Sequence, residues 1–198
     1  AGAGTNNIPI QKMTDLGIPV LNTPGANANA VKELVLTGLL LASRHVVRAW
    51  DFCRQLEGDE HQQHHAVEKQ KKTFVGRELS GKTLAVVGLG AIGVKVANSA
   101  RQLGMNVVGY DPAISVTNAW KLRASVTQAE TLSEAVTHAD YVTIHVPLLP
   151  QTEGMIDEAV IADMKPGAVL LNFARSPVVD AKAVADALQQ EHLNYYVC

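Results

Sequence analysis

The sequence predicts an α/β protein built on a doubly wound parallel sheet. Short apolar runs rich in β-branched residues alternate with stretches of helical periodicity, an alternation typical of parallel strands joined by crossover helices. The first such unit holds the segment T-L-A-V-V-G-L-G-A-I-G at residues 83–93, in which an apolar strand runs directly into a glycine-rich turn. The 198 residues suffice for one good-sized domain, or for one domain and a piece of another.

Composition excludes several classes of function. Hydrophobic residues at 47% and charged residues at 18% are typical of a globular protein, and a net charge of −2 gives no electrostatic reason to bind nucleic acid or an anionic membrane. The most apolar run, 34–42, is too short to span a bilayer. Cys53 and Cys198 lie far apart without metal-ligand spacing, and we expect no signal peptide. We therefore expect a cytoplasmic protein with no nucleic-acid or membrane partner.

The glycine-rich turn predicts a dinucleotide site. Gly88, Gly90 and Gly93 have the spacing G-x-G-x-x-G between a strand at 84–87 and a helix at 94–103. In this context the first glycine permits a tight turn, the second lets backbone approach a pyrophosphate, and the third lets the helix pack closely on the strand. The helix N-terminus adds free N–H groups and the positive end of its dipole. The alternative is a glycine turn in an unrelated α/β protein.

Asp111 makes that alternative weaker. It ends a second apolar strand, 105–110, and comes 18 residues after Gly93. A carboxylate at this position accepts hydrogen bonds from an adenosine ribose and repels a 2′-phosphate. The spacing therefore predicts binding of NAD rather than NADP.

Further strands are expected at 141–145, 168–172 and 195–198, with helices at 132–138, 157–164 and 181–190, the last capped by Asp180. A short helix and then a brief strand are expected within 115–126. Ligands of doubly wound sheets bind at the carboxyl ends of the strands, where the loops 88–93, 111–112, 146–152 and 173–177 would meet. Arg175 is the only cation in the last loop, so we interpret it as a site residue rather than as half of a surface salt bridge.

The first third of the chain is expected to contain a short strand at 18–21, a Pro-Gly turn at 22–25 and a long helix over 29–56. That helix has apolar residues on more than one face, which predicts a bridge between domains, a place in a subunit interface, or both. Residues 57–72 are polar and are expected to form an exposed loop. The loop contains His61, His64 and His65, but nothing nearby completes a metal site, so we expect none.

At this point the chain resembles the D-isomer-specific 2-hydroxyacid dehydrogenases. The matching segments recur in order and run nearly end to end: A-G-A-G-T-N-N-I, G-I-P-V-L-N-T-P-G-A-N-A-N-A-V-K-E-L, L-S-G-K-T-L-A-V-V-G-L-G-A-I-G, G-Y-D-P, H-V-P-L-L-P-Q-T and L-N-F-A-R-S-P-V-V-D. The resemblance implies a Rossmann-type NAD-binding domain with a remnant of the substrate domain. Residues 1–25 would be that remnant, and 26–198 the bridging helix plus an NAD-binding domain that is incomplete at its C-terminal end.

The resemblance also implies residue roles. Arg175 would be catalytic, orienting the 2-hydroxy or 2-keto acid and polarising its oxygen. The substrate carboxylate would be held by Gly2, Ala3 and Arg175. The expected NAD-binding residues are Ala3, Gly88, Gly90, Ala91, Ile92, Gly93, Asp111, Pro112, His145, Val146, Pro147, Thr152, Phe173, Ala174 and Arg175.

The family's proton-transfer histidine and its supporting glutamate would come after Cys198, and both ends of the chain resemble cuts through a larger protein. Neither His145, beside the cofactor at a strand end, nor His192, in an exposed turn, is expected to replace that histidine. We therefore expect a fragment that binds NAD but turns over little substrate. A homodimer through the nucleotide domain and the bridging helix is expected by resemblance.

The segment T-P-G-A-N-A-N-A-V favours, within the family, oxidation of 3-phosphoglycerate to 3-phosphohydroxypyruvate in serine biosynthesis. Two alternatives stay open: a reductase of glyoxylate, hydroxypyruvate or another 2-keto acid, and an NAD-sensing binding protein of the corepressor type. Two departures from the family pattern stand out. Ser176 replaces the glycine that usually follows the arginine, and 55–72 lacks the tryptophan-containing pattern of many members.

Overall fold

The protein is built on one parallel sheet. The computed structural model describes residues 4–5 and 7–198, and within them the strands are ordered β3-β2-β1-β4-β5-β6, with every neighbouring pair parallel. The order reverses between β1 and β4, which is the topological switch point of a doubly wound sheet. The predicted fold class is confirmed. The strands are β1 Thr83–Val87, β2 Asn106–Tyr110, β3 Thr127–Gln128, β4 Tyr141–Ile144, β5 Ala168–Asn172 and β6 Leu193–Val197.

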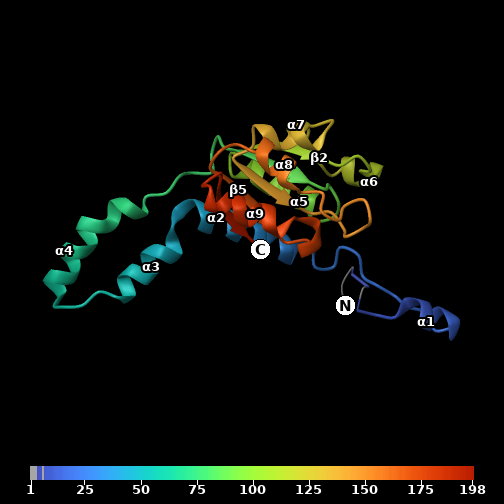
Figure 1. The fold of residues 1–198 in the computed structure, drawn as a ribbon, viewed down its shortest axis with the longest axis horizontal. Helices are drawn as coiled ribbons and strands as arrows, with labels where there is room; N and C mark the ends of the chain where they lie inside the picture. Colours follow the sequence, from blue (N-terminus) through green and yellow to red (C-terminus); the bar gives the residue numbers. More distant parts are fainter. Residues whose placement is uncertain (1–3, 6) are drawn as a thin grey trace.

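Helices cover both faces of the sheet (Figure 1). In chain order they are α1 Ile10–Asp15, α2 Ala28–Arg44, α3 Val46–Arg54, α4 Glu60–Gln70, α5 Gly93–Gln102, α6 Val116–Ala119, α7 Leu132–Thr137, α8 Glu158–Asp163 and α9 Ala181–Gln189, with 3-10 turns at Lys71–Phe74 and Ser176–Val178. Helices α2 and α5 pack on one face, and α7, α8 and α9 pack on the other.

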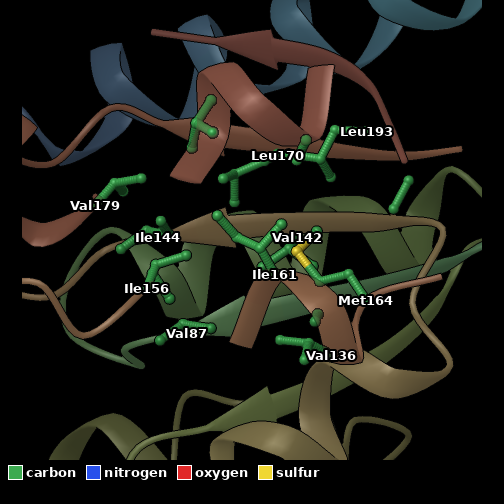
Figure 2. Packing of buried hydrophobic residues seen from close by; sticks show 14 of the residues in the cluster. Val87, Val136, Val142, Ile144, Ile156, Ile161, Met164, Leu170, Val179 and Leu193 are labelled. Carbon is green, nitrogen blue, oxygen red and sulfur yellow. The ribbon is translucent and has the colours of Figure 1, made fainter. Parts of the chain in front are cut away.

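The core is divided by the sheet into two layers. Alternate residues of β5 point to opposite sides, Leu170 toward α8 and α9 and Leu171 toward α2 and α5. Figure 2 shows the layer between the sheet and helices α7, α8 and α9, in which Ile161 and Met164 pack over Val142. Strands β4 and β5 are buried along their whole length, which explains why they appear in the sequence as continuous apolar runs without alternation.

The single long helix expected over 29–56 is wrong. The structure has two helices, α2 and α3, separated by His45, whose φ of 53° lies in the left-handed region. This conformation ends the hydrogen-bond ladder of α2 and turns the chain away from the sheet. No glycine or proline marks the break, and the apolar periodicity of the sequence continues through it. The sequence pattern therefore predicts one helix where the structure has two.

Two further expectations are wrong. Residues 60–70 form α4 instead of a loop, because the Asp59 carboxylate accepts from Gln62 N while the Gln62 side chain accepts from Asp59 N, a reciprocal cap that nucleates the helix. The helix has no buried residue and therefore no apolar stripe to reveal it. Residues 18–21 form no strand in the described chain, and Leu21 is 89% exposed.

Residues 46–75 form an arm, comprising α3, α4 and the turn Lys71–Phe74, that projects from one side of the body (Figure 1). The arm is held together by Phe52 and Phe74, whose ring centroids are 5.5 Å apart. Its two ends meet where Arg77 N donates to Ser43 O at 2.8 Å. On the opposite side, α1 also lies away from the sheet. In the part of the chain that the structure describes, no helix is long and apolar enough to cross a membrane.

Candidate functional site

The three glycines of the turn differ in their surroundings. Gly88 has a φ of 92°, donates to Tyr110 O at 2.8 Å, and lies so close to the next strand that a Cβ would come 2.8 Å from the carbonyl carbon of His145. A Cβ on Gly93 would come 1.9 Å from Gly88 O. A Cβ on Gly90 would meet no atom within 4 Å. Gly88 and Gly93 are therefore required by the fold, whereas the space over Gly90 is open to a ligand.

That open space belongs to a cavity of about 610 Å³. The cavity lies at the carboxyl ends of β1, β4 and β5, beside the switch point of the sheet. Its wall is completed by the segment that leads into α2. The lining residues are Gly4, Thr5, Pro24, Gly25, Asn27, Val31, Gly90, Ala91, Ile92, His145, Val146, Pro147, Leu148, Phe173, Ala174 and Arg175.

The cavity brings together most of the residues that the sequence predicts for the site. Those that line it are Gly90, Ala91, Ile92, His145, Val146, Pro147, Phe173, Ala174 and Arg175. Gly2 and Ala3 lie outside the described residues, although their neighbours Gly4 and Thr5 line the cavity. The predicted residues that are not among the lining residues are Gly88, Gly93, Asp111, Pro112 and Thr152. The segment 24–31, by contrast, was not predicted to line the site.

Asp111 holds the glycine turn to the end of β2. Its Oδ2 accepts from Leu89 N at 2.8 Å, and its Oδ1 accepts from Ala113 N at 2.9 Å. The carboxylate also lines a second cavity of about 280 Å³, next to Leu89 and Ile114. A carboxylate offers about four acceptor sites, so two bonds to backbone leave it able to accept from a ligand hydroxyl.

Thr152 organises the loop that follows β4. Its hydroxyl donates to Pro147 O at 2.6 Å and accepts from Leu149 N at 2.8 Å. These bonds fold residues 147–152 into a compact turn and fix the backbone of Pro147 at the wall of the cavity.

His145 is a neutral imidazole at pH 7. Its Nε2 lies 3.0 Å from the hydroxyl of Thr143, a fully buried residue of β4, and burial lowers the pKa of His145 to about 4. His192 lies at the opposite end of the strands, just before β6, so it is not part of the cavity. The expectation that His192 lies in an exposed turn is wrong: it is partly buried, and its Nε2 is 2.9 Å from Ile161 O.

Arg175 is exposed at the mouth of the cavity, on the loop after β5. It is the one Lys or Arg among the described residues that line this cavity. Its Nη1 donates to Ala174 O at 3.2 Å. Ser176 begins the turn Ser176–Val178 without a positive φ, so a serine replaces the family's glycine here without backbone strain.

Sequence reasoning missed two buried polar residues of the site, Thr143 and Asn172. Asn172 accepts from Ala174 N at 3.1 Å and donates to Arg175 O at 3.2 Å. Each stands as a polar residue within or at the end of an apolar strand, and that contrast is the signal that could have identified them.

No metal centre accompanies this site within residues 4–5 and 7–198. No group of three His, Cys, Asp or Glu side chains that could hold an ion occurs there. His61, His64 and His65 lie on the exposed helix α4, in the arm.

Known proteins resemble this chain in sequence. Residues 39–198 match the family model described as "D-isomer specific 2-hydroxyacid dehydrogenase, NAD binding domain". The D-3-phosphoglycerate dehydrogenase of Methanocaldococcus jannaschii is 38% identical over 190 residues, covering 96% of this chain and 34% of that protein. The hydroxypyruvate reductase of Thermotoga maritima is 38% identical over 184 residues, covering 93% of this chain and 55% of that protein. The chain thus spans about a third to about half of the length of these relatives.

Solved structures agree with the sequence matches. The holo form of Rhodotorula graminis D-mandelate dehydrogenase superposes with a TM-score of 0.82 at 30% identity, covering 98% of this chain and 55% of that one. The D-lactate dehydrogenase of Aquifex aeolicus, complexed with NAD and lactic acid, superposes with a TM-score of 0.79 at 27% identity, covering 98% and 54%. The resemblance of the sequence to the family is confirmed, and NAD is the cofactor of the family's nucleotide domain. The chain belongs to the D-isomer specific 2-hydroxyacid dehydrogenase family, and its residues 39–198 are the NAD-binding domain.

Proposed function

We propose that the protein carrying this chain oxidises 3-phosphoglycerate to 3-phosphohydroxypyruvate with NAD, as an enzyme of serine biosynthesis in the cytoplasm. One observation carries the dehydrogenase part of this proposal. A single cavity is lined by the turn that contains Gly90, by the loops after β4 and β5, and by one guanidinium, that of Arg175. Such a cleft, mostly apolar with a single charged group at the mouth, suits a nucleotide cofactor and a small anionic substrate.

The residues present fit NAD. The open space over Gly90 accommodates a pyrophosphate close to the backbone, and Ala91 and Ile92 lie where α5 begins, with N–H groups that have no carbonyl partner inside the helix. Asp111 would accept hydrogen bonds from the adenosine ribose. Val146, Pro147, Phe173 and Ala174 would enclose the remainder of the cofactor, with Pro112 and Thr152 shaping the loops beside it. When bound, NAD supplies the acceptor for the hydride that leaves the substrate.

Arg175 would hold the substrate. A guanidinium binds a carboxylate through two parallel hydrogen bonds and stabilises negative charge on a neighbouring carbonyl oxygen. Gly2 and Ala3 would contribute backbone N–H groups to the same carboxylate. Of the described residues that line the cavity, His145 is the one histidine, and a ring with a pKa of about 4 that contacts Thr143 is a poor base at neutral pH. The proposal therefore requires a general base from other residues.

The choice of 3-phosphoglycerate is supported by two observations. The segment T-P-G-A-N-A-N-A-V contributes Pro24, Gly25, Asn27 and Val31 to the cavity wall, so the residues that favour this substrate in the sequence lie where they can affect it. D-3-phosphoglycerate dehydrogenases from several organisms are 33–38% identical to this chain. A 2-keto acid reductase is the second candidate, because hydroxypyruvate reductase from T. maritima matches at the same 38%.

We also propose the domain organisation and the assembly. Residues 1–25 belong to a substrate domain, and 26–198 comprise the nucleotide domain and the predicted bridging helix, which the structure divides into α2 and α3. A homodimer forms through the nucleotide domain and the bridging segment α2–α3, supported by apolar side chains that this chain leaves exposed on α2 and α3: Leu34, Leu40, Leu41, Val46, Val47 and Trp50. Apolar side chains gathered on adjacent helices in this way are typical of a protein interface.

Calorimetric titration of this chain with NAD and with NADP tests the cofactor assignment. We expect NAD to bind more tightly, and Asp111→Asn to weaken NAD by about tenfold while narrowing the discrimination against NADP, because the variant loses the charge that repels a 2′-phosphate. Thermal unfolding of the variant controls for loss of the bonds to Leu89 and Ala113. A wild-type chain that prefers NADP would contradict the role of Asp111.

Assays of the complete protein test the substrate. We expect NAD-dependent oxidation of 3-phosphoglycerate with a higher kcat/KM than reduction of hydroxypyruvate or glyoxylate by NADH. A higher value for either keto acid would replace the proposed substrate by the second candidate. NAD-dependent association without turnover of any acid would instead identify a corepressor-type sensor.

A further inference from the structure

Asn172 is a polar side chain at the end of an otherwise apolar strand. It is the last residue of β5 and is 6% exposed. Among the described residues it is one of three buried polar side chains, with Ser43 and Thr143. A buried amide needs hydrogen-bond partners, so the partners of Asn172 show what this residue holds in place.

Two of the three partners belong to the loop that lines the cavity. The Oδ1 atom of Asn172 accepts from Ala174 N at 3.1 Å, and Nδ2 donates to Arg175 O at 3.2 Å. The third partner is in the sheet, where Nδ2 donates to the hydroxyl of Tyr196 on β6 at 3.2 Å. One planar amide therefore connects the last two strands of the sheet to the backbone on both sides of Arg175.

We propose that Asn172 is the positioning residue for Arg175. The inference rests on the proposed function, in which the Arg175 guanidinium holds the substrate. That guanidinium is exposed and donates only to Ala174 O among the bonds found for it, so its direction depends on the backbone of the loop. On the far side, the loop is anchored by the fully buried Val178. On the near side, Asn172 provides the anchor through the two bonds to Ala174 and Arg175.

The chemistry of the site makes this position matter. A charged group stabilises a developing oxyanion only when it is held in place before the reaction, and a misplacement of about 1 Å costs on the order of 10²-fold in rate. A rigid amide on a strand end is a better support than a mobile loop alone, because the strand is fixed by its ladder on both sides.

A double-mutant cycle in the complete protein with saturating NAD tests the proposal. Asn172→Asp keeps an acceptor for Ala174 N but turns the donor that faces Arg175 O into an acceptor. We expect N172D to lower kcat/KM by about tenfold or more, with a raised KM for the hydroxy acid. In the Arg175→Ala background the same change should lower kcat/KM by less than about twofold, because residues that act through one another are not additive.

Tyr196→Phe is the matched control. It removes the side-chain hydrogen bond between Asn172 and Tyr196 and leaves both bonds to the loop, so we expect kcat/KM to change by less than about twofold. If N172D fails to fold, Asn172→Ser provides the same cycle without the added charge.

Additive effects of N172D and R175A would overturn the proposal, as would a Tyr196→Phe effect equal to that of N172D, because both results indicate a general structural anchor. A wild-type protein that binds NAD but oxidises or reduces none of the acids contradicts the proposed function instead. The two failures are therefore distinguishable.

Discussion

At the scale of single residues, the glycine turn shows how one spacing pattern contains three different requirements. The Cβ that Gly93 lacks would collide with Gly88 O, and the Cβ that Gly88 lacks would collide with the backbone of His145. Gly90 has no such neighbour. The sequence predicts the three roles from spacing, and the distances show that the fold has no room for a Cβ at two of the glycines and has open space at the third.

Gly93→Ala and Gly90→Ala separate these roles. We expect Gly93→Ala to lower the free energy of unfolding by about 3 kcal/mol or more, because its Cβ would lie 1.9 Å from a backbone oxygen. Gly90→Ala should change the unfolding free energy by less than about 0.5 kcal/mol, yet weaken NAD by about tenfold or more. Urea unfolding and NAD calorimetry measure the two effects. Full NAD affinity in Gly90→Ala would show that the pyrophosphate does not approach this residue.

At the scale of elements, polar side chains cap the N-termini of several helices and so define where those helices begin. The side chains of Asp59, Ser115, Thr131, Asp157 and Asp180 each accept from a backbone N–H in the first turn of the helix that follows. The cap at Asp180 was predicted and is confirmed. The cap at Asp59 is not predicted, because α4 has no buried residue and therefore no apolar stripe that would indicate a helix after it.

The start of strand β4 is likewise held by polar interactions, those of the Asp140 carboxylate. Asp140 Oδ2 accepts from Thr83 N at 2.9 Å, and its Oδ1 accepts from Lys165 Nζ at 2.6 Å, which connects the starts of β4 and β1 with the segment before β5. Burial raises the pKa of Asp140, but the bonds from Lys165 and Thr83 outweigh it, so the net pKa lies below its usual value of 3.8.

The lowered pKa of Asp140 predicts that the free energy of unfolding depends on pH. A lowered folded-state pKa means that the contribution of Asp140 is fully present above pH 3.8 and is lost as the pH falls through the folded pKa. Asp140→Asn should therefore lower the unfolding free energy at pH 7 by about 1 kcal/mol, a value limited by the partial exposure of Lys165, and by progressively less below pH 3.8. Urea unfolding at several pH values measures this difference. An equal loss at pH 7 and at low pH would contradict the assignment.

At the scale of the whole molecule, the parallel sheet brings the residues of the site together, whereas the arm projects away from the sheet. Residues distant in sequence, such as Val31, Gly90, His145 and Arg175, meet in one cavity because parallel strands end at the same edge. The arm, by contrast, turns away at His45 and leaves Trp50 56% exposed, with Arg54 stacked over its ring. Exposed apolar side chains of this kind are typical of a surface that another protein surface covers.

Two tryptophans provide a matched test of the dimer. Trp50 is on the arm, and Trp120, at 86% exposure, follows α6 on the other side of the body (Figure 1). We expect Trp50→Glu to produce a monomer, because a charge would be buried in the proposed interface, whereas Trp120→Glu should leave the dimer intact. Light scattering over a range of concentrations measures the assembly. A monomeric wild-type chain, or a Trp50→Glu dimer as stable as wild type, would contradict the proposed interface.

The sequence by itself determined the fold class, the glycine turn, the acid at the end of β2 and the arginine after β5. Each of these depends on local information: apolar runs, glycine spacing, or a charged residue directly after a strand. Only the tertiary structure decided the break at His45, the wall formed by 24–31, and the amide of Asn172 that supports the loop carrying Arg175. These features arise from contacts between segments far apart in the chain, or from a backbone conformation that no local residue type requires. The hydrophobic pattern of the sequence therefore does not predict them.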